Sequence, residues 1–568
     1  MIDQHLPRYS NPQDIVEFVD KLAAFERGDI GPEEFRAFRL LRGVYGQRQE
    51  AKQMLRVKLP MGLAGPSQLE ALADVAQQYS RGFGHVTTRQ NLQFHYMKMS
   101  DAEAAMIRLA DAGLTTREAC GNSVRNVTAC ELAEVCADAP FDVTPYAEGI
   151  VRLFLGHPLS SSLPRKFKIA FSGCAHDCAK GAIHDLGFIA TVQDGVPGFR
   201  VLAAGGLSST PQNALVLHDF VPAGELGRVG EAIVRLFHAL GNRENKHRAR
   251  LKYVLRKLKE DGFRAKYAEF RNAIDHEAAL ELTLPNERPQ NLMTPVLSER
   301  RLPTYLAWKS SNVIKQRNAD HSAVYVRLEL GDITADQLRA LRGIVTRFGD
   351  GTLRFTIDQN IVIPWVDSRS LPALHAELEA TNLARTGIHT ARDITSCPGA
   401  DTCNLAVTTS RQLATAIRER LELSDTEGLS ALTNTVIKVS GCPNSCGQHH
   451  VADLGFHGGA RTIGKETYPI YQLHLGGGVD QRGARFGRQV VKILARRVPE
   501  ATVRLLRLFE SARVEHETTQ TFFERVDPKV VLQALGEILS DPPTPEDRLD
   551  IGETVGFLIH SGEGECAA

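Results

Sequence analysis

The strongest constraint on the fold of this chain is that its sequence repeats itself. Ser172–Cys178 reads Ser-Gly-Cys-x-x-x-Cys, and the same pattern returns at Ser440–Cys446. The motif Asp-Leu-Gly-Phe follows both copies at the same distance, from Asp185 and from Asp453. Further pairs keep the order along the chain: Gln90-Asn91 with Gln359-Asn360, Cys130-Glu-Leu-Ala with Cys403-Asn-Leu-Ala, and Gly205-Gly206 with Gly476-Gly477. Such self-similarity predicts a duplicated unit with two pseudo-equivalent halves.

Both halves combine strand and helix patterns. Gly84–Tyr96 and Leu353–Val366 are rich in β-branched and aromatic residues, as strands are. Ser67–Ser80 and Asp336–Arg347 carry apolar residues at helical spacing. The mixture predicts an α+β fold with two small layered units and two larger lobes. We expect the following segments: an N-terminal helical segment 1–45, a first small unit 46–116, a first lobe 117–283, a proline-rich linker 284–304, a second small unit 305–385, a second lobe 386–540 and a C-terminal tail 541–568.

The composition excludes several classes of protein. Lys+Arg and Asp+Glu both number 67, which argues against a nucleic-acid binder. The basic stretch Asn242–Lys259 is expected to be a solvated helix face. No apolar run is long enough for a membrane span, and the N-terminus carries no secretory signal, so we expect a cytoplasmic protein. Grouped cysteines in a reducing compartment indicate metal binding or catalysis.

Four cysteines of the second half have the spacing of a metal centre. Cys397 and Cys403 form C-x5-C, and Cys442 and Cys446 form C-x3-C. Four thiolates from two loops are what a cubane [4Fe–4S] cluster needs. Zinc also accepts four cysteines, although its usual spacing is shorter in the first pair. The pattern favours the cluster and leaves zinc, or inert core cysteines, as alternatives.

With these motifs, the chain resembles the sirohaem-dependent nitrite and sulfite reductase family from about Arg36 to about Leu539. The resemblance rests mainly on the cysteine pattern and on the Gly-Gln-His-His that follows Cys446. It implies a duplicated fold of two ferredoxin-like half-domains and two larger α+β lobes. It also implies that Cys397, Cys403, Cys442 and Cys446 bind the cluster and that Cys446 bridges to the sirohaem iron.

The same resemblance indicates a distal pocket for an anionic substrate. Leu55–Pro60, Gly121–Val127 and Leu163–Lys168 resemble the family's substrate-facing segments. Burying an anionic cofactor and substrate without cations would cost several kcal/mol per ion, and the reaction needs proton donors. We expect the catalytic residues to be Arg56, Arg125, Lys166 and Lys168. The two lysines alternate in a probable strand and so face one side, where they are best placed to pass protons.

Other polar residues resemble the family's cofactor-contacting positions. The expected sirohaem-binding residues are Thr88, Arg89, Gln90, Asn91, His95, Asn126, Gln359 and Asn360, together with Cys446. His449 and His450 look like metal ligands, but we expect a structural or supporting role because four thiolates already complete the cluster.

The predicted function is assimilatory reduction of sulfite to sulfide by six electrons. No dinucleotide fingerprint stands out, so electrons should come from another protein, ferredoxin first and a flavoprotein second. The near alternative is reduction of nitrite to ammonia. Less favoured are an enzyme like precorrin-3B synthase, from cobalamin synthesis, and a structural four-cysteine zinc protein.

The first half also holds cysteines, and we interpret them as a relic of duplication. Cys130, Cys174 and Cys178 are matched with Cys403, Cys442 and Cys446. The counterpart of the fourth ligand then falls on Val124, which cannot bind iron, and only Cys120 lies near enough to substitute. We therefore expect one cubane and about four non-haem irons per chain.

Overall fold

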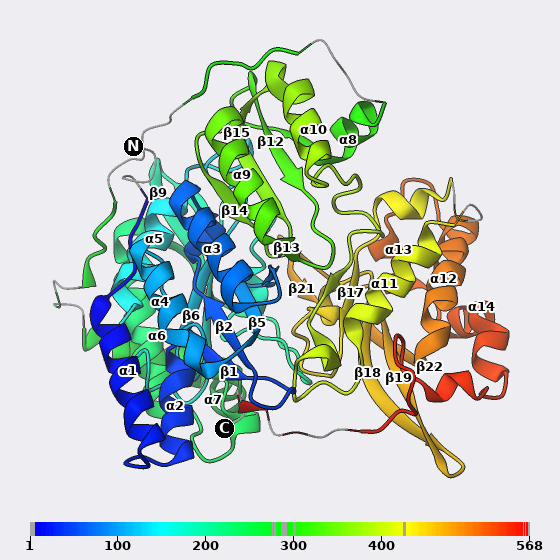
Figure 1. Ribbon diagram of the computed structural model, residues 1–568, viewed down its shortest axis with the longest axis horizontal. Coiled ribbons are helices and arrows are strands. Elements are labelled where there is room, and N and C mark those ends of the chain that lie inside the picture. Colours follow the sequence, from blue (N-terminus) through cyan, green and yellow to red (C-terminus); the bar gives the residue numbers. More distant parts are fainter. Residues whose placement is uncertain are drawn as a thin grey trace.

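The computed structural model describes residues 6–274, 277, 280–285, 292–298, 303–423, 426, 428–559, 562, 564 and 565. Part of the predicted linker 284–304 and Cys566 lie outside these ranges. The first half lies on the left of Figure 1, the second small unit at the top and the second lobe on the right. None of the described helices is long and apolar enough to cross a membrane.

Two small five-stranded antiparallel sheets form the centre of the molecule. The first has the order β1 (Val44–Gly46), β2 (Gln53–Val57), β5 (Leu92–Met97), β4 (Phe83–Val86) and β13 (Asp332–Thr334). The second has the order β11 (Val313–Lys315), β12 (His321–Val326), β15 (Ile361–Asp367), β14 (Leu353–Phe355) and β3 (Leu63–Ala64). Their helices are α3 (Pro66–Tyr79), α4 (Ala102–Asp111), α9 (Ala335–Phe348) and α10 (Leu371–Ala380).

The two small units exchange strands and share one core. Strand β13 of the second half pairs with β4, and strand β3 of the first half pairs with β14. Helices α3 and α9 pack against each other (Figure 1). In α3, Leu69, Leu72 and Val75 are fully buried, which is the apolar stripe that the helical spacing predicts. The two halves are therefore interwoven.

Each large lobe contains a five-stranded sheet of the same topology. The first has the order β10 (Leu215–Pro222), β9 (Val196–Ala203), β8 (Leu186–Gln193), β7 (Phe167–Ser172) and β6 (Val124–Ala129). The second has the order β16 (Thr395–Ser396), β17 (Ile437–Ser440), β18 (Leu454–Ile463), β19 (Glu466–Leu475) and β22 (Arg488–Leu494). In both sheets, three parallel strands are followed by two antiparallel ones. The hairpin β20 (Gly478–Asp480) and β21 (Gly483–Arg485) stands apart from them.

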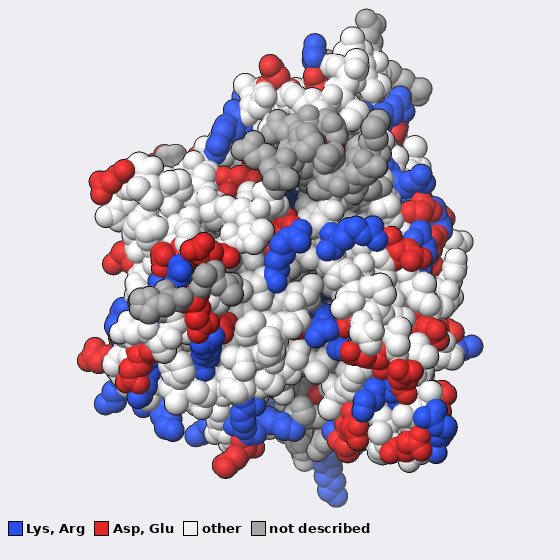
Figure 2. All heavy atoms as spheres, turned by 90° about the vertical axis from the view of Figure 1, so that its left-hand side faces the viewer, with Lys and Arg blue, Asp and Glu red and all other residues white. Residues whose placement is uncertain are grey.

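Helices cover the lobe sheets and the N-terminal side. In the first lobe they are α5 (Thr144–Phe154), α6 (Leu226–Leu240) and α7 (Leu251–Asn272); in the second they are α11 (Ser410–Leu421), α12 (Val498–Ala512), α13 (Thr519–Arg525) and α14 (Pro528–Ser540). The remaining helices are α1 (Pro12–Glu26), α2 (Pro32–Leu41) and α8 (Tyr305–Asn312). Figure 2 shows the side carrying α1 and α2, where acidic and basic side chains are interspersed, as the balanced composition suggests.

Candidate active site

The four predicted cluster cysteines come from two loops that follow neighbouring parallel strands. Cys397 follows β16, and Cys442 follows β17 after one glycine. The Gly441 backbone N–H donates to Cys397 Sγ at 3.3 Å. Cys442 lies near the other three thiols, and burial followed by their charges raises its pKa. A bound metal would remove this cost, because it takes up thiolates. The structure thus brings the predicted ligands together.

Glycine makes the close approach of these loops possible. A Cβ added to Gly441 would stand 2.7 Å from the Thr408 carbonyl oxygen and 2.9 Å from the Cα of Gly399. A Cβ added to Gly399, whose φ is +61°, would stand 2.4 Å from Ser410 Oγ. Any larger residue would force the two loops apart, and with them the thiols.

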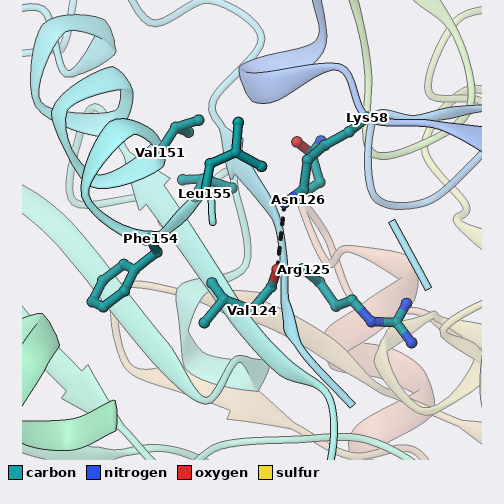
Figure 3. A pocket seen from close by; sticks show the side chains of 8 residues that line it. Lys58, Val124, Arg125, Asn126, Val151, Phe154 and Leu155 are labelled. Atoms are coloured by element: carbon teal, nitrogen blue, oxygen red, sulfur yellow. Dashed lines mark hydrogen bonds between the residues drawn. The ribbon is translucent and has the colours of Figure 1, made fainter. Parts of the chain in front are cut away.

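Two of the predicted substrate arginines converge on one carbonyl. Arg56 on β2 and Arg125 on β6 both donate to the Ala119 oxygen, at 3.2 and 3.1 Å. Arg125 also donates twice to the Gly121 oxygen. Figure 3 shows that its guanidinium points away from the small apolar pocket formed by α5 and β6. Lys58 lies in that pocket, where its ammonium group donates to the Val124 oxygen at 3.4 Å. The Lys58 ammonium and the Arg125 guanidinium therefore point in different directions (Figure 3).

The predicted lysines and Arg89 continue this cationic group. Burial lowers the pKa of Lys168 well below its usual value, and the charges of Arg89, Arg250 and Lys166 lower it further. Burial and the nearby Arg125 lower the pKa of Arg89 to about 9. Cys446 lies close enough to Lys168 to act in the opposite direction. The cations and the fourth cluster cysteine therefore share one neighbourhood.

The predicted cofactor-contacting amides hold the backbone. Gln90 exchanges two hydrogen bonds with Ala129, the residue before Cys130. In the second half, Gln359 accepts from the N–H of Ser396, the residue before Cys397.

Asn91 and Asn360 accept from the Leu59 and Leu328 N–H groups, and the side chain of Asn126 donates to the Leu59 and Arg89 oxygens. These amides set the positions of the loops. Their contact with a cofactor remains a prediction.

Thr88 and His95 lie in different surroundings. The Thr88 hydroxyl donates to the Cys446 carbonyl oxygen at 3.1 Å, which places this turn directly on the cluster loop. His95 on β5 is buried beside His85, and burial lowers its pKa to about 3. It is therefore a neutral imidazole whose Nδ1 has no hydrogen-bond partner within the described ranges.

The site includes residues that the sequence reasoning missed. Arg250 and Lys252 are buried rather than part of a solvated helix face. Arg250 binds both oxygens of Asp185, at 3.2 and 2.7 Å, and Asp185 also accepts from the Lys168 N–H. Lys252 donates to two carbonyl oxygens of the loop after β9. The expectation was wrong for these two residues, because a folded loop and Asp185 supply the acceptors that water would otherwise supply. Other basic residues of the stretch, such as Arg256, Lys257 and Lys259, are exposed as expected.

His449 and His450 belong to a buried group that also contains His457 and His474. The His457 Nδ1 and His474 Nε2 atoms are 2.8 Å apart, and His450 Nε2 lies 2.9 Å from the Ser208 oxygen. His449 is fully buried, and neither of its ring nitrogens has a hydrogen-bond partner among the described residues. The group links the cluster loop to the β18–β19 hairpin, which agrees with a supporting role.

The structure corrects the match between the cysteines of the two halves. Ala129 pairs with Phe171 in the first lobe, and Ser396 pairs with Val439 in the second. Cys130 therefore corresponds to Cys397, not to Cys403. The predicted match of Cys130 with Cys403 depends on the Leu-Ala that lies near both cysteines. The strand register shows that this shared Leu-Ala is coincidental. Cys120 packs with Leu40 and Met54, away from the loops that carry the other first-half cysteines.

The residues present fit the two expected groups. Four thiols from two loops suit a [4Fe–4S] cluster. Beside them, Arg89 keeps Nε and Nη1 buried without a hydrogen-bond partner in the described part of the chain. Buried donors of this kind are costly unless an acceptor reaches them. An anionic macrocycle such as sirohaem would supply that acceptor.

Comparison with known proteins agrees with this geometry. The family model for the nitrite and sulphite reductase 4Fe-4S domain matches residues 120–273 and 387–542. The model for the nitrite/sulfite reductase ferredoxin-like half domain matches residues 45–112 and 314–381. Each model matches twice, as the internal repeat requires.

Individual relatives cover most of the chain. A sulfite reductase (ferredoxin) of Mycobacterium tuberculosis (strain CDC 1551 / Oshkosh) is 30% identical over 546 residues, covering 91% of this chain and 93% of the relative. A ferredoxin–nitrite reductase of Synechococcus elongatus is 30% identical over 436 residues, covering 75% of this chain and 80% of the relative. The solved structure of the Mycobacterium tuberculosis NirA protein matches with a TM-score of 0.77 and 27% identity, covering 92% of this chain and 96% of that one.

These matches confirm the predicted α+β fold with duplicated ferredoxin-like half-domains, the oxidoreductase class and the pairing of sirohaem with a [4Fe–4S] cluster. The chain belongs to the nitrite and sulphite reductase family.

Proposed function

We propose that this chain is an assimilatory sulfite reductase that reduces sulfite to sulfide with electrons from a separate protein. The observation that carries the proposal is the group of cations beside the loop of Cys446. Lys168 has Arg89, Arg250 and Lys166 as electrostatic neighbours, and Cys446 among them. A dianion is the ligand that such a site binds best, because it offsets the repulsion between the neighbouring cations.

Each cation has a distinct task in this proposal. Sirohaem coupled to the cluster supplies the reducing electrons when both are bound. Arg56 and Arg125, which are held by the Ala119 oxygen, bind and orient the anion. Lys166 directly precedes β7 and Lys168 is the second residue of that strand, so the two lysines, two residues apart, reach the same side and deliver protons to departing oxygen atoms. Arg89 and Asn126, which both belong to the first half of the chain, would hold the macrocycle.

Nitrite is the second candidate substrate. It is favoured by the 30% identity to the Synechococcus elongatus nitrite reductase. Nitrite carries a single charge, so it gains less from a pocket with several ammonium and guanidinium groups. Sulfite therefore stays our first choice.

Ferredoxin is the proposed electron donor, with a flavoprotein as the alternative. The Mycobacterium tuberculosis and Synechococcus elongatus relatives are both named as ferredoxin-linked enzymes. We also propose a cytoplasmic location, since the nine described cysteines are all free of disulfides, as a reducing compartment would keep them.

Replacement of Arg56 by glutamine tests the proposed pocket. A charge-assisted hydrogen bond contributes about 1.5–3 kcal/mol, so kcat/KM for sulfite should fall by about 10–100-fold. The matched control is Arg461→Gln, on an exposed part of β18. Sulfide formation with chemically reduced enzyme is the assay, and the Soret band checks that sirohaem is still bound. Unchanged sulfite kinetics in Arg56→Gln would contradict the assignment of this pocket.

A further inference from the structure

The first lobe contains a second set of four cysteines with the spacing of the cluster ligands. Cys130 and Cys136 form C-x5-C, and Cys174 and Cys178 form C-x3-C. The register of the parallel strands places each pair where its counterpart stands in the second lobe. Cys130 directly follows β6, as Cys397 follows β16, and Cys174 follows β7 after one glycine, as Cys442 follows β17.

Two backbone hydrogen bonds recur in the C-x5-C loops of both lobes. The Cys136 N–H donates to the Leu132 oxygen at 2.7 Å, and the Cys403 N–H donates to the Gly399 oxygen at 3.0 Å. The Cys130 N–H donates to the Phe171 oxygen, and the Cys397 N–H donates to the Val439 oxygen.

The C-x3-C loops also agree in detail. Asp177 and Lys180 have positive φ values of 52° and 57°, and their counterparts Ser445 and Gln448 have 58° and 64°. Such values are rare outside glycine, so their recurrence at matched positions shows that the loop was kept and not merely its sequence spacing.

The four first-lobe thiols are neighbours. The pKa of Cys178 is affected by Cys130 and Cys174, and the pKa of Cys136 is affected by Cys174, so the side chains of the two loops face one another. Their exposure follows the order found in the second lobe. In each set the first and third cysteines are buried, the second is half-buried and the fourth is exposed. None of these cysteines forms a disulfide in the structure.

We propose that Cys130, Cys136, Cys174 and Cys178 bind a second [4Fe–4S] cluster. Four soft thiolates that converge from two loops are a ligand set for an iron–sulfur cluster or for zinc. The family model for the 4Fe-4S domain matches the first lobe, residues 120–273, as well as the second, residues 387–542. The cubane is therefore the better assignment for the first lobe. The interpretation of these cysteines as a relic rested mainly on the lack of a fourth ligand at the position of Val124, and Cys136 supplies that ligand.

We expect no second sirohaem to bind beside this second cluster. Where the first pocket has Arg56, the pseudo-equivalent position carries Tyr325, whose hydroxyl donates to Glu131 at 3.4 Å. Where the first pocket has Arg89, the equivalent position carries Asp358, which is paired with Lys180 and Lys438. Glu131 would repel the carboxylates of the macrocycle, and Asp358 occupies Lys180 and Lys438, the two cations that could bind them. The first-lobe centre is thus expected to hold iron and sulfide but no substrate.

Iron and sulfide analysis of the holoenzyme tests the proposal. Protein purified without oxygen and replete in sirohaem should contain about eight non-haem irons and eight acid-labile sulfides per chain. A single cluster would give about four of each. Zinc is measured in the same samples by mass spectrometry.

Two variants assign the extra iron to its ligands. Cys174→Ser and Cys136→Ser should each lose about four irons while the Soret band of sirohaem stays. Cys120→Ser is the matched control, since it changes another buried first-half cysteine outside the set. Cys136 is half-buried, so Cys136→Ser is less apt to disturb folding than Cys174→Ser. If Cys174→Ser does not accumulate as folded protein, the result for Cys136→Ser is used.

Four outcomes would overturn the proposal. For the wild-type protein, they are about four irons in a sirohaem-replete sample and one equivalent of zinc in place of the extra iron. For the Cys174→Ser and Cys136→Ser variants, they are the same iron content as in the control and loss of the Soret band together with the iron. The proposal does not depend on the substrate. Eight irons in a protein that does not reduce sulfite would refute the proposed function and leave the second cluster standing.

Discussion

Replacing Asp358 by asparagine should destabilise the junction between the two halves. Asp358 lies between β14 and β15 and is paired with Lys180 of the first lobe, 2.8 Å away, and with Lys438 on β17. The lysine side chains are 14% and 2% exposed. Burial alone would raise the pKa of Asp358, but the two lysines hold it well below its usual value. Asparagine would leave the Lys180 and Lys438 ammonium groups without the carboxylate that they share, and Glu131 would act only on Lys180.

The magnitude follows from the burial of the three groups. Removing one partner of a buried ion pair costs about 3–5 kcal/mol. We take about 3 kcal/mol, the lower end of that range, because the Asp358 side chain keeps 24% exposure and water can screen the lysines. One kcal/mol corresponds to about 2–4 °C in Tm for a unit of 150–250 residues, so Tm should fall by about 6–12 °C.

Thermal unfolding of the holoenzyme at neutral pH measures this effect. Asp336→Asn is the matched control, because the same chemical change is made on a side chain that is 97% exposed. Its effect should stay within about 0.5 kcal/mol. A Tm for Asp358→Asn within about 2 °C of the control value would refute the reasoning.

The pH dependence gives an independent check of the sign. The folded-state pKa of Asp358 is depressed, so its stabilisation is present above the unfolded-state value of about 3.9. It is lost as the pH falls through the folded-state pKa. The difference in Tm between wild type and Asp358→Asn should therefore be constant from neutral pH down to about pH 5 and shrink below about pH 4. A difference that grows on acidification would contradict the ion-pair account.

Three other changes give separable results. If Cys446 bridges the cluster and the sirohaem, as the family resemblance implies, Cys446→Ser should weaken both groups together, whereas Cys397→Ser should mainly damage the cluster. Absorption and iron analysis of both variants distinguish them, and normal sirohaem absorption with full activity in Cys446→Ser would rule out the bridge. Lys168→Asn should lower sulfite turnover more than nitrite turnover, because the dianion loses more attraction; equal losses in parallel assays would refute this. Leu72→Ala, in the fully buried stripe of α3, should cost about 2–5 kcal/mol in thermal or urea unfolding, and a cost below about 0.5 kcal/mol would show that the shared core is not tightly packed there.

The repeat made much of this molecule predictable. Motifs that return in one order predicted two halves, and helical spacing predicted the buried face of α3. The exchange of β3 and β13 was not predictable, because such short strands carry almost no periodic signal and pair with partners far along the chain. Residues that act through the backbone, such as Gln90 and Gln359, were found as polar motif positions but not as supports of the cysteine loops.

Other parts of the site needed three-dimensional contacts. Arg250 reads as a surface charge in a basic stretch until Asp185, which lies far from it in sequence, provides its partner. The role of Cys136 was hidden because a local Leu-Ala identity suggested the wrong match for Cys130. Strand register separates these matches, because Ala129 and Ser396, which directly precede Cys130 and Cys397, pair with corresponding residues of β7 and β17.

The substrate specificity of the reduced enzyme tests most directly whether the chain is a sulfite reductase. Sirohaem-replete protein, supplied with a chemical reductant, is assayed on sulfite and on nitrite under one set of conditions. We predict that sulfide is formed with six electrons consumed per sulfite, and that kcat/KM for sulfite exceeds that for nitrite. Absence of sulfide formation, or a higher kcat/KM for nitrite, would contradict the assignment of this enzyme as a sulfite reductase.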